Sequence, residues 1–500
     1  MKFREKLKCY RIPCLIVIAL IFIAIIVIGL LSRDSAEKDV NKYFIDLTYH
    51  PESQSFEGKM RLEYQNNDTI SVKNIVLLLY PNAFSTPEST PFEQADMALA
   101  YPAGFSKGSI SVTDIKINNK DADYSLSENG QQLFLLPESP IPVNGKCTVS
   151  LSFTLTVPHA SGRFGYMGNT VNLGNWYPIA AVTENGMPIL TDYTPVGDPF
   201  YSHVADYDIN ISTPYDYLVI ASSPTEVSLH DGYAFWSTRS TNMRDFALVI
   251  TKDIKCITDN SCGTTVNCYY TDNDVQAKNA VKAASDSIKL FEEIYGKYPY
   301  AQFNIVQTSF FIGGMEYPGM VLIDNSYFKT GNAHPLENVI VHECAHQWWY
   351  ACAGNDQINN AWIDEGLATY STMLYYERYK DEETYKLYYK YYITNGYRFH
   401  RESLQSKYGN VDQSLSRNLN DFENNEIYNM VCYEKSAMML QSIREILGDE
   451  LFFSNIKQLY HNHINGIITP ESFIRWMSKN TDKPVKELIN SWINDKVFIP

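Results

Sequence analysis

Length, composition and charge exclude several classes of protein at the outset. The chain has 500 residues, of which 45% are hydrophobic and 20% are charged, which is typical of a folded globular protein and not of a disordered one. A chain of this length exceeds one compact core, so we expect two or three domains. The formal net charge of -16 argues against nucleic acid as a partner, because binding phosphate requires basic surfaces.

The first feature along the chain is an uncharged, mostly apolar run from Ile12 to Leu31. It is long enough to span a bilayer as a helix, and the basic residues before it keep the N-terminus in the cytoplasm. We therefore expect a cytoplasmic segment at 1–11, a single transmembrane helix at 12–31 and a catalytic part outside the cytoplasm, at the cell membrane. A cleaved signal peptide is the alternative, but its apolar core is usually shorter and no clean cleavage site follows Leu31.

The next two hundred residues or so have the pattern of β-strands. Residues 43–49 and 58–64 alternate apolar and polar side chains, as half-buried strands do. Clusters of Pro, Gly, Asn and Ser separate further runs of this kind. These runs lie at 76–80, 147–157, 206–212, 217–221 and 246–250. We expect a β-rich domain of the sandwich type over residues 40–251.

The remaining segment, residues 252–500, is expected to be mainly α-helical. Residues 275–295 have helical periodicity, and a strand-like segment at 303–308 interrupts the helical pattern. Pro335 suits the first turn of a helix that can continue to Tyr350. The whole chain is therefore predicted to belong to the α+β class.

A zinc-binding pattern lies on that last helix. His342, Glu343 and His346 form an HExxH sequence, in which the two histidines are one helical turn apart and can meet one ion. Glu343 is rotated away from the pair and can reach water next to the metal. Two histidines on a helix without any metal are the alternative interpretation.

A third ligand is expected from the next amphipathic helix. Eighteen residues separate His346 from Glu365, and Asp364 is the competing carboxylate. Two histidines and Glu365 leave a fourth position open, as a catalytic zinc site requires.

Three motifs together resemble one family. The HECAHQWW sequence and the DEG of WIDEGLA, with eighteen residues between His346 and Glu365, are similar to the zinc aminopeptidases that include aminopeptidase N and leukotriene hydrolase, which are gluzincin metallopeptidases. Gly313-Gly314-Met315-Glu316-Tyr317 resembles that family's GxMEN substrate-binding stretch, and Tyr433-Glu434-Lys435-Ser436-Ala437 resembles its YEKG element. The resemblance covers residues 275–492 and implies a thermolysin-like catalytic domain with one zinc ion per chain and peptides as substrates.

The resemblance and the chemistry of peptide hydrolysis assign roles to these residues. Glu343 is expected to act as the general base, and Tyr433, by resemblance, to donate a hydrogen bond to the oxyanion. Glu316 offers the negative charge that an N-terminal ammonium group needs. Gly313 and Gly314 allow a close approach of backbone to an extended peptide.

Some features leave other functions open. Tyr317 stands where the family pattern has Asn, and Ser436 where it has Gly, so details of substrate contact are open. The family's usual C-terminal helical domain is expected to be absent. Besides a membrane-anchored aminopeptidase, the sequence permits a zinc endopeptidase, an epoxide hydrolase or a non-catalytic peptide-binding surface protein. It does not indicate the preferred N-terminal residue or the oligomeric state.

Overall fold

The computed structural model describes residues 39–409 and 411–496. The expected cytoplasmic segment and transmembrane helix at 1–31 lie outside these residues. Within the described part of the chain, none of the helices combines the length and the apolar character needed to cross a bilayer. The described residues from Asn41 onward pack as one compact unit, so a domain boundary near residue 251 stays a prediction.

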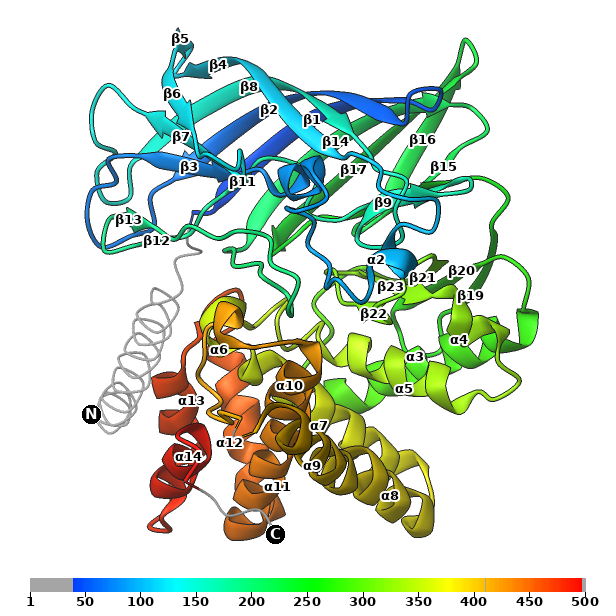
Figure 1. The fold of residues 1–500 in the computed structure, drawn as a ribbon, viewed down its shortest axis with the longest axis vertical. Coiled ribbons are helices and arrows are strands. Elements are labelled where there is room, and N and C mark those ends of the chain that lie inside the picture. The colour runs from blue at the N-terminus through cyan, green and yellow to red at the C-terminus, as the bar shows by residue number, and fades with distance from the viewer. Residues whose placement is uncertain (1–38, 410, 497–500) are drawn as a thin grey trace, which may run out of the picture. The chain divides into compact units, whose positions relative to one another are not determined.

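The β-rich part is built on a large sheet of eight strands in the order β16-β17-β14-β1-β2-β8-β4-β5 (Figure 1). The sheet is mixed, because β1 runs parallel to β14 and antiparallel to β2. Its strands are β1 (Asn41–His50), β2 (Ser55–Gln65), β4 (Ser109–Ile117), β5 (Lys120–Asp121), β8 (Lys146–Thr156), β14 (Ala205–Pro214), β16 (Thr225–His230) and β17 (Tyr233–Met243). Alternate residues of β1, such as Ile45 and Leu47, are buried, which agrees with the alternation expected there.

Two four-stranded sheets and one two-stranded sheet complete this part of the protein, and the four-stranded sheets share a hydrophobic core with the large sheet. One contains β9 (Phe164–Met167), β10 (Thr170–Leu173), β15 (Leu218–Ala221) and β18 (Leu248–Thr251). Another contains β3 (Ile75–Leu78), β6 (Asp123–Leu126), β7 (Gln132–Leu136) and β11 (Ile179–Ala180), and β12 (Thr183–Glu184) pairs with β13 (Met187–Pro188). Two short helices, η1 (Tyr80–Ser85) and α2 (Met97–Ala100), lie in the connections. The expected β-rich N-terminal half is confirmed.

The second half contains more sheet than the sequence predicted. Its five strands have the order β19-β20-β21-β23-β22, whereas only a strand near 303–308 was expected. They are β19 (Lys255–Asp259), β20 (Thr265–Tyr270), β21 (Gln302–Thr308), β22 (Gly314–Met315) and β23 (Met320–Asp324). Residues 320–323 of β23 are all buried, so this strand lacks the alternation that reveals a half-exposed strand.

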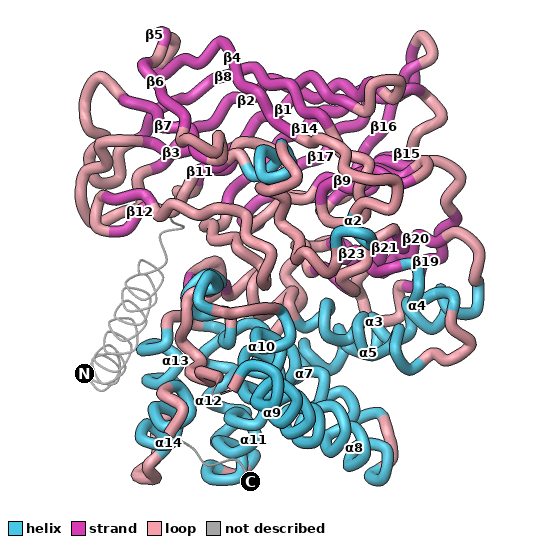
Figure 2. The backbone as a smooth tube through the Cα atoms, in the orientation of Figure 1, coloured by secondary structure: helices cyan, strands magenta, loops and turns pink. Residues whose placement is uncertain are grey.

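Helices form the rest of the second half, and Figure 2 shows them gathered below the strands. They are α3 (Asp274–Ile294), α4 (Asn325–Lys329), α5 (His334–Ala345), α6 (Gln357–Asn360), α7 (Trp362–Tyr379), α8 (Glu382–Tyr388), α9 (Asn395–Tyr408), α10 (Asn425–Asn429), α11 (Ser436–Leu447), α12 (Asp449–His461), α13 (Pro470–Met477) and α14 (Val485–Ile493). Shorter elements are the π-helical η2 (Tyr389–Thr394) and η4 (Met430–Lys435), the 3-10 helix η3 (Leu419–Asp421) and the strand pair β24 (Gly354–Asn355) and β25 (Ile467–Ile468). The helix expected at 275–295 is α3.

The helix that carries the HExxH sequence ends earlier than predicted. We expected it to continue to Tyr350, but α5 ends at Ala345. The chain then turns sharply, with the amide of Ala351 donating to the carbonyl of His346 at 3.0 Å. Tyr350 has a φ of 111°, which a helix does not permit and which a bulky residue rarely adopts.

Candidate active site

Two packed helices, α5 and α7, bring the three expected metal ligands together. His342 lies in the last turn of α5, His346 caps its C-terminus, and Glu365 lies in the first turn of α7. The Nε2 atoms of His342 and His346 are 3.1 Å apart. Each Nε2 atom lies 3.3 Å from Oε2 of Glu365. Two imidazoles and one carboxylate therefore face a common point.

The size of this triangle fits a zinc ion. Ligand atoms placed at zinc–ligand distances of about 2.0–2.1 Å around a tetrahedral centre are about 3.3 Å from one another. The observed separations of 3.1 and 3.3 Å match that spacing. The competing carboxylate of Asp364 is already engaged, since the side-chain amides of Asn355 and Gln357 both donate to it at 2.7 Å. Glu365 is thus the better third ligand.

The turn after α5 orients one of the imidazoles. Nδ1 of His346 lies 3.0 Å from the carbonyl oxygen of Trp349. A carbonyl can only accept a hydrogen bond, so Nδ1 carries the proton and Nε2 keeps its lone pair for a metal. The early end of α5 and the turn after it therefore orient His346 so that its Nε2 can bind a metal.

Glu343 and the GGME stretch face each other across the cavity. A Cβ atom on Gly314 would lie 2.1 Å from Oε1 of Glu343, so a larger residue at this position would displace the Glu343 carboxylate. Glu316 is 4% exposed, and its buried Oε1 has no hydrogen-bond partner among the described residues. Burial raises the pKa of both Glu343 and Glu316. An unpaired buried carboxylate oxygen is costly unless a ligand satisfies it.

Tyr433 contacts two of the expected metal ligands. Its hydroxyl donates to Oε1 of Glu365 at 2.6 Å. Its ring stacks on the ring of His342 with centroids 5.5 Å apart. The residue lies on the π-helical segment η4, an irregularity that often marks functional sites.

These residues line one cavity of about 620 Å³ between the β-rich and helical parts. Its acidic lining residues outnumber the basic ones. The acidic ones are Glu93, Asp96, Asp198, Glu316, Glu343, Glu365 and Glu434, whereas Arg163 is the only arginine or lysine among the described lining residues. The cavity is therefore suited to a ligand that carries positive charge.

Comparison with known proteins agrees with this geometry. Residues 279–492 match the model of the Peptidase family M1 domain. The chain carries a peptidase family M1 domain. The family expected from the motifs, its zinc cofactor and the class of zinc metallopeptidase are thereby confirmed.

Relatives of the M1 domain come from several kingdoms. The chain is 24% identical over 312 residues to "Alanine/arginine aminopeptidase" of Saccharomyces cerevisiae, covering 60% of this chain and 34% of that protein. It is 25% identical to "Aminopeptidase M1-A" of Oryza sativa subsp. japonica, covering 47% of this chain and 27% of that protein. The chain thus spans about a third or less of the length of these relatives.

Solved M1 structures show the same fold over nearly the whole chain. A mutant M1 zinc metallopeptidase from Deinococcus radiodurans, bound to a Tyr-Ser-Ala substrate, superposes with a TM-score of 0.65 at 13% sequence identity. The match covers 92% of this chain and 95% of that chain. The β-rich half followed by a helical half is therefore the fold of a known M1 metallopeptidase.

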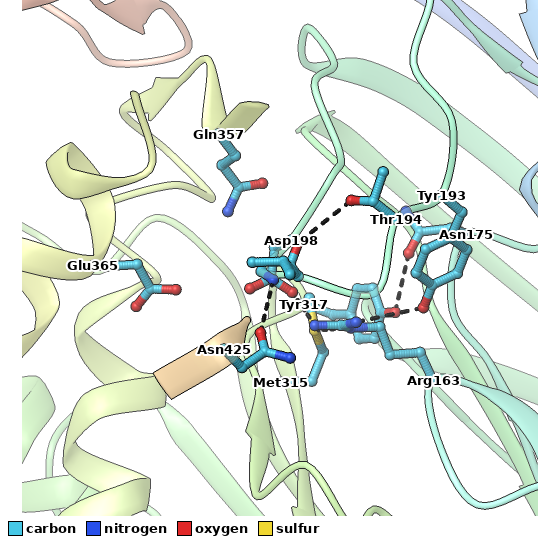
Figure 3. A network of polar contacts seen from close by, with 12 residues as sticks. Arg163, Asn175, Tyr193, Thr194, Asp198, Met315, Tyr317, Gln357, Glu365 and Asn425 are labelled. Atoms are coloured by element: carbon cyan, nitrogen blue, oxygen red, sulfur yellow. Dashed lines mark hydrogen bonds and ion pairs between the residues drawn. The ribbon is translucent and has the colours of Figure 1, made fainter. Parts of the chain in front are cut away.

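The β-rich half contributes two charged residues that the sequence analysis did not assign to the site. Arg163 and Asp198 form a buried ion pair beside Met315 of the GGME stretch (Figure 3). Nε of Arg163 also donates to the sulfur of Met315 at 2.9 Å. Burial raises the pKa of Asp198 to about 7, although Arg163 opposes that rise. The sequence gives no direct sign that these two residues form a pair at the site, because they meet only in the fold.

The departure at Ser436 has a simple packing explanation. A Cβ atom on Gly366 of α7 would lie 2.5 Å from Cβ of Ser436, so the glycine makes room for the serine side chain. The hydroxyl of Ser436 donates to the carbonyl of Val431 at 3.1 Å. Ser436 therefore fits the M1 domain without displacing Tyr433.

A titratable pair on the cavity wall gives a first prediction. Nδ1 of His400 lies 3.0 Å from Oε1 of Glu434, and this hydrogen bond raises the pKa of His400 above the ordinary 6.5. The pair should stabilise the fold below about pH 6.5, and this contribution should disappear as pH rises through the raised pKa. We expect Glu434→Gln to return the His400 pKa toward 6.5, measured by NMR titration of labelled histidines.

The control is Glu382→Gln, which removes an exposed carboxylate on the nearby α8. It should leave the His400 titration unchanged. A wild-type His400 that titrates at or below pH 6.5 would contradict the pairing.

Proposed function

We propose that this chain is an aminopeptidase that uses zinc to release N-terminal amino acids from peptides. One observation supports the exopeptidase activity above all others. Glu316 presents an unpaired, buried carboxylate oxygen to the cavity that also holds His342, His346 and Glu365. An α-ammonium group supplies the positive charge and the donors that this oxygen lacks.

The chain's own residues divide the work of hydrolysis. When bound by His342, His346 and Glu365, zinc supplies Lewis acidity toward a peptide carbonyl and water. Glu343 takes a proton from the attacking water and transfers it to the leaving amine, so that a carboxylate and an amine result. Glu316 holds the N-terminus, which sets the register at one residue.

Two further groups complete the arrangement. Gly313, with a φ of 118°, and Gly314 let the substrate backbone pass close to Glu343. Asp198 is a second buried acid from the β-rich half that lines the same cavity, and it reinforces the negative potential around the ammonium group.

Tyr433 should stabilise the oxyanion that forms during attack. The hydroxyl of Tyr433 donates to Glu365 and therefore already lies beside the expected metal ligands. We expect Tyr433→Phe to lower kcat by about 10²–10³-fold, as loss of one oxyanion donor does elsewhere, with KM and zinc content unchanged. Steady-state kinetics with metal analysis measure both.

The matched control is Tyr428→Phe, because the ring of Tyr428 packs against the ring of Tyr433 and its hydroxyl lies 3.5 Å from the same Glu365 oxygen. This change should cost less than about tenfold in kcat, since a hydrogen bond as long as 3.5 Å is weak even when its acceptor is a carboxylate. Equal losses in the two variants would show that Tyr433 acts only on the structure of Glu365.

The direct experiment is release of a chromophore from a panel of aminoacyl anilides, with and without a zinc chelator. We expect release that the chelator abolishes and that added zinc restores. N-acetylated anilides should not be cleaved, because the acetyl group removes the charge that Glu316 binds. Cleavage of the acetylated substrates would favour an endopeptidase, and no cleavage of any substrate by zinc-loaded protein would favour a binding protein.

We also propose that residues 12–31 anchor the protein in the cell membrane with its catalytic part outside the cytoplasm. The uncharged run and the basic residues before it support this proposal. Wild-type protein should sediment with membranes and resist alkaline carbonate, whereas a variant that begins at residue 39 should be released. Wild-type protein without its first residues, or free of membranes, would contradict the anchor.

A further inference from the structure

Two adjacent charged residues, Arg244 and Asp245, connect the β-rich half to the candidate active site. They follow β17 directly and are each 2% exposed. Neither forms an ion pair with another described residue, so the polar atoms of both side chains are satisfied by hydrogen bonds. Such buried charges are costly and are usually kept for a purpose.

Arg244 reaches into the turn that follows His346. Its Nε donates to the carbonyl of Tyr350 at 2.6 Å, and its Nη2 donates to the carbonyl of Cys352 at 3.2 Å. Nη2 also donates to Gly466 at 2.8 Å, and Nη1 to Ser202 at 2.6 Å. A planar, five-donor group is the side chain that can hold several carbonyls at once.

The turn held by Arg244 is the one that orients a metal ligand. Trp349, whose carbonyl accepts from Nδ1 of His346, precedes Tyr350 in the chain. Tyr350 has the left-handed φ of 111°, a conformation that persists only where the surroundings enforce it. The hydrogen bond from Arg244 to the carbonyl of Tyr350 supplies that enforcement.

Asp245 is linked through Asn175 to Tyr317, the residue that follows the GGME stretch. Its Oδ2 accepts from the side-chain amide of Asn175 at 2.7 Å. Oδ1 of Asn175 in turn accepts from the hydroxyl of Tyr317 at 3.2 Å, and Figure 3 shows Asn175 and Tyr317 on neighbouring segments. A Cβ atom on Gly174 would lie 1.8 Å from that hydroxyl, so the β-rich half has a space for this tyrosine. Tyr317 is the residue after Glu316.

We propose that Arg244 and Asp245 form a positioning junction that fixes His346 and Glu316 relative to each other. Arg244 acts on the metal ligand through the turn at Tyr350. Asp245 acts on the ammonium-binding carboxylate through Asn175 and Tyr317. The inference rests on the proposed aminopeptidase function and explains why tyrosine is accepted at position 317.

Replacements at the two ends of the junction, the Arg244 arm and the arm from Asp245 to Tyr317, should have different effects. Arg244→Met should weaken zinc binding by about 10–100-fold, the usual effect of losing a contact that orients a ligand, measured by competition with a chromophoric chelator. Saturating zinc should restore kcat, and Arg244→Lys should recover part of the affinity. KM for aminoacyl anilides should stay near the wild-type value once zinc is saturating.

On the other arm, Tyr317→Phe and Asp245→Ala should raise KM for free-amine substrates by about fivefold or more and leave zinc affinity unchanged. The double variant should be no worse than the more affected single variant, because the two residues act in one chain of contacts. A Tyr317→Phe variant with wild-type KM would overturn this arm.

Controls separate positioning from loss of stability. Arg417→Met removes another buried arginine that donates to backbone carbonyls, and Tyr80→Phe removes another buried hydroxyl bonded to a side chain. Neither should change zinc affinity or KM. If the junction variants only lower Tm, or if the controls match them, the junction is merely structural. Zinc affinity is measured without turnover, so a failure of the Arg244 arm is distinguishable from a failure of the proposed function.

Discussion

Replacement of Glu343 by alanine should lower kcat by about 10²–10⁴-fold, the usual contribution of a general base. Glu343 is not one of the three expected metal ligands, and its carboxylate lies beside Gly314 at the wall of the cavity. Zinc content and Tm should therefore stay near the wild-type values. Single-turnover kinetics on an aminoacyl anilide, with metal analysis of the same sample, measure the effect.

Glu337→Gln is the matched control for this prediction. Glu337 is a glutamate of the same helix, but it pairs with Lys380 outside the cavity. Its replacement should leave kcat within about twofold of the wild type, because Glu337 does not line the cavity. An active Glu343→Ala variant that retains its zinc would show that another group is the base.

Replacement of Glu316 by glutamine should lower kcat/KM for free-amine substrates by about 30-fold or more. Removing one partner of a buried, charged hydrogen bond costs about 2–5 kcal/mol, and each 1.4 kcal/mol is about tenfold. The loss should fall mainly on KM, because the ammonium group is bound in the ground state as well as in the transition state. N-acetylated substrates should remain uncleaved by the variant, as by the wild type.

Asp96→Asn tests whether any acid on the cavity wall would have the same effect. Asp96 lines the same cavity but is partly exposed, so solvent screens its charge and a small change in KM is expected. Equal effects of the two variants would mean that the general negative potential, and not Glu316, recognises the N-terminus.

The sequence predicted the parts of the protein that depend on local pattern. Strands such as β1 and β8 alternate, because one face is buried and the other is wet. The metal ligands follow from helix geometry, since His342 and His346 are one turn apart and Glu365 begins the next long helix. These features need no knowledge of distant contacts.

What the sequence did not reveal depends on contacts between distant segments. Residues 320–323 of β23 are all buried, so this strand lacks the alternation by which a half-exposed strand is recognised. The helix α5 was extended five residues too far, because the turn at Tyr350 is held by Arg244 from the other half of the protein. Arg163 and Asp198 were not assigned to the site for the same reason, since they approach Met315 only in the folded chain.

The most direct measurement is a crystal structure of zinc-loaded protein with anomalous diffraction data collected at the zinc edge. We predict one zinc ion per chain, coordinated by Nε2 of His342, Nε2 of His346 and the Glu365 carboxylate. A single anomalous peak elsewhere, or three side chains that do not share the ion, would contradict the proposed site and the function built on it.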